Sequence, residues 1–152
     1  MALEFNTIGV KLKYCVETVK GSRPSTGYLE IPDIKSTPSF DFNPSKLQCT
    51  NLSDSTHRYL DGVQDVGDSY DYLANLTSDL KTKWESMVSA ANVAWASGKS
   101  TWFETVIPNF GSFYFAGRPN QLGVNEMGVD AVIETTLHIV PNQIIGFATS
   151  ST

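Results

Sequence analysis

NEMGVDAVIETTLHIVPN, residues 125–142, contains the most regular pattern in this chain of 152 residues. Over residues 130–140, apolar and polar side chains alternate. The apolar side is Ile133, Leu137 and Ile139, and the polar side is Glu134, Thr136 and His138. Alternation with a period of two is typical of a β-strand with one buried face. Because no nucleophile, metal-binding cluster or phosphate-binding loop accompanies it, the stretch predicts a structural strand, not part of a catalytic pocket.

The same alternation occurs in residues 8–19, where Leu12, Tyr14 and Val16 share one side of a predicted strand. Shorter strand-like runs occupy residues 28–31, 40–42, 70–72, 102–107 and 113–115, and several of them end at Gly, Pro or Asn, which favour turns. Most of the chain is therefore expected to form β-strands joined by short polar turns.

One helix is predicted, from about residue 78 to the middle nineties. Thr77 is a suitable N-cap, Asp79 suits the positive end of the helix dipole, and Gly98 is a natural stop. The apolar stripe at helical spacing is Leu80, Trp84, Met87, Val88, Ala91 and Trp95. Strands on both sides of one helix predict a mainly β fold, an antiparallel β-sandwich or barrel with one α-helix packed at the side. Residues 1–152 are expected to form a single domain, with no C-terminal immunoglobulin-like domain.

The composition favours a folded, soluble protein. Hydrophobic residues make up 41% of the chain, and the net charge of −5 argues against a nucleic-acid clamp, which normally carries a basic patch. No signal peptide and no run of about 20 apolar residues is present, so no membrane segment is expected. Cys15 and Cys49 are predicted to be free thiols in a reducing cytoplasm, with a disulfide as the alternative.

The residue types that usually carry catalysis do not form a recognisable site. Glu134 and His138 lie about 13 Å apart along a strand, too far to share a metal ion. The acidic residues of the polar loop lack the order of an EF-hand, and the nucleophile-elbow, dinucleotide and phosphate-loop motifs are missing. We therefore expect no enzyme activity, no metal and no cofactor.

Residues 43–68 differ from the rest of the chain. They are rich in Ser, Thr, Asp and Asn, and a weakly apolar stretch of this length in a compact domain is usually functional or disordered. Tyr59, Leu60 and Val63 lie within it, which predicts a long loop or hairpin that docks on something.

Four stretches together resemble the major tail tube proteins of long-tailed, siphophage-type bacteriophages. They are Ile31-Pro32-Asp33-Ile34 with the Phe40-Asp41-Phe42 strand, the polar loop Thr50–Asp68, the segment Lys99–Gly111 after the helix, and the opening stretch 125–142. The resemblance covers about residues 8–142. It departs from the family at Ala90–Ser97, where the predicted helix is longer than the family's usual short helix.

The resemblance implies a virion protein, made in the host cytoplasm, that self-assembles into hexameric rings stacked as a tail tube for DNA ejection. Its expected partners are further copies of itself and the tape-measure, tail-tip and tail-terminator proteins, with DNA passing through the lumen unbound. The loop 43–68 is expected to make inter-ring contacts, with Tyr59, Leu60 and Val63 as candidate anchors. The alternative is that these three residues pin the loop to its own core.

Carboxylates facing such a lumen would repel phosphate. The candidates on the polar faces of predicted strands are Glu17, Asp41, Asp71 and Glu134, against the alternative of ordinary solvated positions. Two other functions stay open. One is the inner tube of a contractile tail or injection system, and the other is a carbohydrate-binding or adhesion β-sandwich using Trp95, Trp102, Tyr70 or Tyr72 as sugar platforms.

Overall fold

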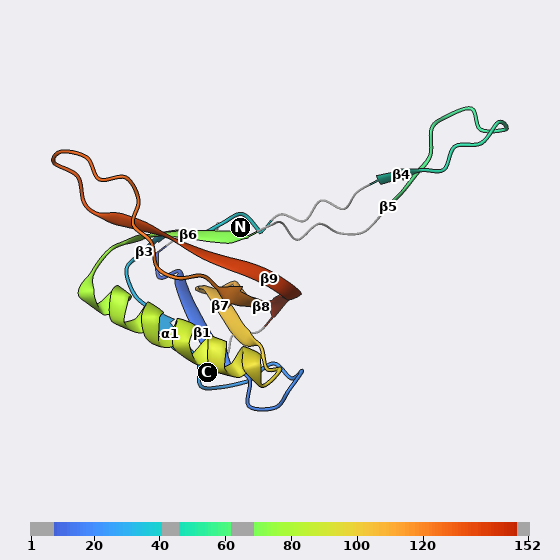
Figure 1. Cartoon of the computed structure of the whole chain (residues 1–152). Helices are drawn as coiled ribbons and strands as arrows, with labels where there is room; N and C mark the ends of the chain where they lie inside the picture. The colour runs from blue at the N-terminus through green and yellow to red at the C-terminus, as the bar shows by residue number, and fades with distance from the viewer. Residues whose placement is uncertain (1–7, 41–45, 62–68, 149–152) are drawn as a thin grey trace.

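The computed structural model describes residues 8–40, 46–61 and 69–148. Within these ranges one helix and two sheets are formed (Figure 1). The elements, in chain order, are β1 (Lys11–Val16), β2 (Leu29–Ile31), β3 (Ile34–Ser36), β4 (Lys46–Gln48), β5 (Tyr59–Asp61), β6 (Tyr70–Asn75), α1 (Ser78–Ala96), β7 (Thr101–Ile107), β8 (Gly111–Pro119) and β9 (Glu134–Ala148).

The main sheet is antiparallel and has the strand order β2-β1-β7-β8-β9-β6-β3. Its two edge strands, β2 and β3, are consecutive in the chain and are joined by Pro32 and Asp33 alone. Asp33 turns the chain in the left-handed region with φ 64° and accepts a hydrogen bond from the Thr77 hydroxyl (2.6 Å). Because so short a link joins the two edges, the sheet must curl back on itself. The result is a nearly closed barrel, which confirms the predicted fold class.

Helix α1 covers the apolar face of this sheet. Leu80, Trp84 and Met87 are fully buried in one cluster with side chains of β1, β6, β7, β8 and β9. The Trp84 indole also donates a hydrogen bond to the Asn120 carbonyl (2.9 Å), so the ring is held both by packing and by a polar contact.

Both ends of α1 lie close to the positions that the sequence predicts. The Thr77 hydroxyl accepts a hydrogen bond from the Leu80 amide (3.2 Å), and Gly98, with φ 75°, follows the C-cap. The predicted stripe is wrong at one position, because Ala94 is buried and Trp95 is 49% exposed. Ala94 continues the spacing of three to four residues from Met87 and Ala91, whereas Trp95 is rotated off the packed side.

The opposite face of β1, β7 and β8 is covered by residues 17–28. The Arg23 guanidinium lies 4.1 Å from the centroid of the buried Tyr114 ring, and Tyr28 packs edge-on against the same ring. The Tyr114 hydroxyl donates to the carboxylate of buried Glu104. The barrel wall is therefore enclosed on both sides in this region.

Strand β9 is longer than predicted. It begins at Glu134, so Ile133 precedes it and is exposed, contrary to the expectation of an inward position. The alternation is otherwise as predicted, with Leu137 and Ile139 buried. The strand continues past Pro141 because the register against β8 shifts there, and a bulge tolerates a proline that an ordinary central position would not.

A strand is also found at Ile34–Ser36, where the sequence predicts none. Of the strand predicted at residues 40–42, residues 41 and 42 lie outside the described residues. Phe40 forms no strand in the described part and instead stacks on Phe113, with ring centroids 4.2 Å apart. No helix in the described ranges is long and apolar enough to cross a membrane.

Candidate assembly surfaces

The β4–β5 hairpin forms a sheet of its own. Its strands pair antiparallel with Leu47 opposite Leu60 and Gln48 opposite Tyr59. Figure 1 shows this hairpin at a distance from the barrel and the helix. It lies within residues 43–68, where the sequence predicts a loop or hairpin.

The tip of the hairpin is ordered by its own polar groups. The Asn51 side chain accepts hydrogen bonds from the Ser53 amide (3.0 Å) and hydroxyl (2.6 Å). Asp54 accepts from the Asn51 amide (2.9 Å) and pairs with Arg58 (3.1 Å). Since side-chain acceptors satisfy the turn amides, the tip has a defined shape without contact to the barrel.

The strands of the hairpin, by contrast, leave apolar side chains in solvent. Leu47 and Leu60 are cross-strand neighbours on one face, and Tyr59 and Leu60 are 57% and 60% exposed. A two-stranded hairpin is marginal in water unless one face packs on something. The exposure argues against the alternative that Tyr59 and Leu60 pin this segment to its own core. Val63 lies outside the described residues.

Among the predicted lumen carboxylates, Glu17 does not lie on the exposed strand face that the sequence pattern predicts. The structure buries it, leaving 4% exposed. Its carboxylate accepts hydrogen bonds from the Gly21 amide (3.1 Å), the Ser100 amide (3.1 Å) and the Trp102 indole (2.8 Å). Strand β1 ends at Val16, so the alternation that put Glu17 on a solvated face no longer applies there. Glu17 anchors the 17–28 loop and faces no channel in this conformation.

Asp71 and Glu134 lie on the outward side of the adjacent strands β6 and β9. Asp71 is hydrogen-bonded to the His138 ring across the strands (2.6 Å), and Glu134 pairs with Lys35 (3.2 Å). The hydrogen bond from the Ser69 hydroxyl contributes most to lowering the pKa of Asp71. Partial burial opposes that shift, and His138 lowers the pKa further. Asp41 lies outside the described residues.

The aromatic residues proposed for a sugar platform are mostly inaccessible. Tyr70, Tyr72 and Trp102 are buried, and Tyr72 donates or accepts a hydrogen bond with Thr105 inside the core (2.8 Å). Trp95 alone of the four is exposed, and Arg118 lies over its ring (5.1 Å to the centroid). A carbohydrate-binding module built on these four side chains is therefore disfavoured.

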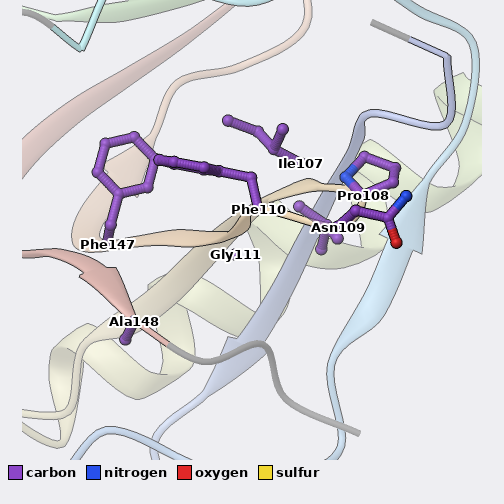
Figure 2. A pocket seen from close by; sticks show the side chains of 8 residues that line it. Ile107, Pro108, Asn109, Phe110, Gly111, Phe147 and Ala148 are labelled. Carbon is purple, nitrogen blue, oxygen red and sulfur yellow. The ribbon is translucent and has the colours of Figure 1, made fainter. Parts of the chain in front are cut away.

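An open pocket of about 450 Å³ lies at the turn between β7 and β8. Its lining is Val106, Ile107, Pro108, Asn109, Phe110, Gly111, Phe147 and Ala148, and it is mostly apolar. Figure 2 shows the Phe110 and Phe147 rings next to each other in this lining, and they pack edge-on with centroids 5.2 Å apart. No charged side chain lines it, so it offers contact area without catalytic groups.

The described residues contain no group of three or more His, Cys, Asp and Glu side chains arranged for a metal ion. Cys15 and Cys49 are both free thiols. Burial raises the pKa of the Cys15 thiol, which lowers its nucleophilicity at neutral pH.

Sequence reasoning missed one surface. Residues 120–133, here named the β8–β9 arm, connect the last two strands and carry exposed apolar side chains. These are Val124, Met127, Val129, Val132 and Ile133. The signal was present in the opening stretch, where apolar residues outside the alternating strand have no partner in the sheet.

Comparisons with known proteins give a fold and no sequence family. No family model matches the chain. No curated protein matches it either. Among solved structures, a chain of the anti-feeding prophage baseplate, six-fold symmetrised, is similar with a TM-score of 0.61 and 9% identity, covering 97% of this chain and 98% of that one.

Two gene transfer agent structures give the same result. A chain from the tail of the empty particle, with C6 symmetry, has a TM-score of 0.59 and 15% identity. A chain from the native particle has a TM-score of 0.57 and 14% identity, and each comparison covers 94% of this chain and 98% of the other. The likeness therefore extends over nearly the whole of each chain, and at these identities it shows a shared fold.

Proposed function

We propose that this chain is a structural protein of a phage-type tail. Copies of it assemble into hexameric rings, and the rings stack into a tube through which DNA is ejected. The observation that carries the proposal is the end-to-end fold similarity to chains of six-fold tail and baseplate assemblies. In this role the protein resides in the virion tail after synthesis in the host cytoplasm, and it is not an enzyme.

The β4–β5 hairpin is our candidate for the contact between stacked rings. Its strands present the Leu47–Leu60 pair and Tyr59 to solvent, and its tip is ordered by its own hydrogen bonds, as a contact element would require. Burying these side chains against the next ring removes apolar surface from water and stabilises the hairpin at the same time. A contact between unlike surfaces of successive rings does not close on itself, so it generates a tube.

The outward face shared by β6 and β9 is our candidate for the channel lining. It carries Asp71 and Glu134, and the chain as a whole has a net charge of −5. His138 and Lys35 offset part of the negative charge on this face. Carboxylates distributed in this way keep phosphate groups moving past the wall without a binding site. The same role predicts contacts with tape-measure, tail-tip and tail-terminator proteins.

A second candidate is the inner tube of a contractile tail or injection system. The similarity to the anti-feeding prophage baseplate chain favours it, since that match has the highest TM-score of the three comparisons described. Both candidates use the same ring and the same stacking surface. A gene for a sheath protein beside the gene for this chain would select the second.

Negative-stain electron microscopy of the concentrated protein, with and without isolated tail tips as seeds, tests the proposal. We expect hollow tubes with a regular axial repeat and six-fold end views. A protein that remains monomeric with and without seeds contradicts the proposal. Tubes without six-fold symmetry contradict the hexameric ring and leave the tube intact.

A further inference from the structure

The β8–β9 arm is built as a projecting element with a fixed base. Its base is held to β9, because the Thr135 hydroxyl donates to the Gly123 carbonyl (2.6 Å) and the Asn125 amide donates to the Glu134 carbonyl (3.0 Å). Beyond this base the apolar side chains point into solvent, and Val129 is 94% exposed. An apolar run supported in this way is typical of a docking surface.

The charged side chains of the arm are all acidic. The sequence from residue 119 to residue 152 contains no Lys or Arg, and its acidic residues are Glu126, Asp130 and Glu134. Glu126 and Asp130 lie within the arm and are exposed. A partner surface for the arm should therefore combine apolar area with positive charge.

The C-terminal end of α1 has both properties. Trp95 is 49% exposed there, and the Arg118 guanidinium lies over its ring. Lys99 follows the helix, and the Lys20 ammonium lies beside Gly98. We name the exposed residues Trp95 and Arg118 the helix-end patch.

The base of the arm lies beside α1, where Gln121 and Leu122 line a pocket with Asn92, but the exposed apolar run from Glu126 onward projects away from the helix-end patch of its own chain. Figure 1 shows the arm, between β8 and β9, projecting at the upper left, whereas α1 ends at the lower right, below the barrel. Two complementary surfaces at different places on one subunit make a head-to-tail contact between copies, which closes into a ring or continues as a filament.

We propose that the β8–β9 arm of one copy packs on the helix-end patch of a neighbouring copy, with Glu126 facing Arg118. This inference rests on the proposed self-assembly and adds the pair of surfaces that joins neighbours. It is separate from the β4–β5 hairpin, which joins rings in the proposed function.

Charge reversal tests the pairing. The variants Glu126→Lys and Arg118→Glu each place like charges together, so we expect the critical concentration for sedimentable assemblies to rise about tenfold or more in each. Lys83→Glu is the matched control for Arg118→Glu, since Lys83 is exposed on α1 away from its C-terminal end, and it should not change assembly. Thermal unfolding of every variant checks that the monomer fold is unchanged.

Mixing the two variants gives the sharpest result. In an equimolar mixture the arm of Glu126→Lys meets the patch of Arg118→Glu, and the arm of Arg118→Glu meets the unchanged Arg118 of the other variant. Both contacts are then between opposite charges, so an alternating ring with an even number of subunits assembles although neither variant does alone. The double variant, which is complementary to itself, should also assemble.

Each outcome separates this inference from the proposed function. If wild type assembles and both single variants assemble as well, the arm contact is overturned and the tube proposal stands. Single variants that fail, with no recovery in the mixture or the double variant, overturn the pairing of Glu126 with Arg118. A wild type that does not assemble even with tail-tip seeds overturns both proposals.

Discussion

Replacing Glu17 by alanine should unfold the protein at a markedly lower temperature. The Glu17 carboxylate is buried and accepts three hydrogen bonds, from the Gly21 and Ser100 amides and the Trp102 indole. These bonds fix the start of the 17–28 loop to the beginning of β7, while the Glu17 amide donates to the Ser100 carbonyl (3.0 Å). Alanine removes the acceptor and leaves all three donors in place.

The expected loss follows from these contacts. A hydrogen bond to a charged group contributes about 1.5–3 kcal/mol, and a buried donor without a partner costs about 1–3 kcal/mol. Water can reach the two backbone amides in the variant more easily than the buried Trp102 indole, so the three terms do not add fully. We expect a loss of about 3 kcal/mol in the free energy of unfolding. For a chain of this size, that lowers the midpoint temperature by roughly 6–12 °C.

Urea and thermal unfolding of the isolated protein measure this loss. Glu17→Gln, which keeps one acceptor oxygen, should lose less than Glu17→Ala. Glu30→Ala is the matched control, because Glu30 makes one exposed ion pair with Lys11 at 3.9 Å and should cost under about 0.5 kcal/mol. If Glu17→Ala is as stable as Glu30→Ala, the Glu17 carboxylate is solvated, and a position facing the channel regains support.

Three further predictions follow from the other contacts. Leu60→Ser should change the free energy of unfolding by no more than about ±0.5 kcal/mol, as a surface substitution does, but should abolish sedimentable tubes. Val19→Ser, also at an exposed position, should change neither stability nor tube formation. Tyr72→Phe removes a buried hydroxyl that is hydrogen-bonded to Thr105 and should lower the free energy of unfolding in urea by about 1–3 kcal/mol. The assemblies seen by electron microscopy should be the same as those of the wild type. Because the pKa of Asp71 is lowered in the folded state, its stabilising contribution is present above the unfolded value near ~3.9 and is lost as the pH falls through the folded value. The stabilities of wild type and Asp71→Asn should therefore differ at neutral pH and converge in acid, once the pH is below the lowered pKa of Asp71; a difference that stays constant with pH contradicts the assignment.

The elements with strong periodicity were predictable from the sequence. The helix and its N-cap at Thr77 follow from spacing and a hydroxyl at the right place, and the inward positions Leu137 and Ile139 follow from alternation. These patterns depend on interactions between residues close in the chain, so a local reading is enough. The hairpin region was likewise predictable, because its polar composition is unsuited to a hydrophobic core.

The errors occur where contacts distant in sequence decide the position of a side chain. Glu17 is buried because a loop folds back and three donors from distant parts of the chain converge on it, which alternation along β1 cannot reveal. Trp95 is exposed although it is large and apolar, because its ring lies under the Arg118 guanidinium at the surface, while the neighbouring Ala94 is buried. The passage of β9 through Pro141 depends on a register shift against β8 that no local pattern predicts.

Alternation separates the inside of a subunit from its outside, but it does not separate an outside that faces water from an outside that faces another copy. Tyr59 and Leu60 in the hairpin and Val129 in the arm are exposed apolar residues on elements that project from the barrel. Single exposed apolar side chains are ordinary on a monomer. Here they are grouped on two projecting elements, and each element is ordered by its own hydrogen bonds. Such groups offer apolar surface for contacts with another copy. The acidic arm and the basic helix end then supply direction, because opposite charges at different places on one subunit favour head-to-tail neighbours over random association.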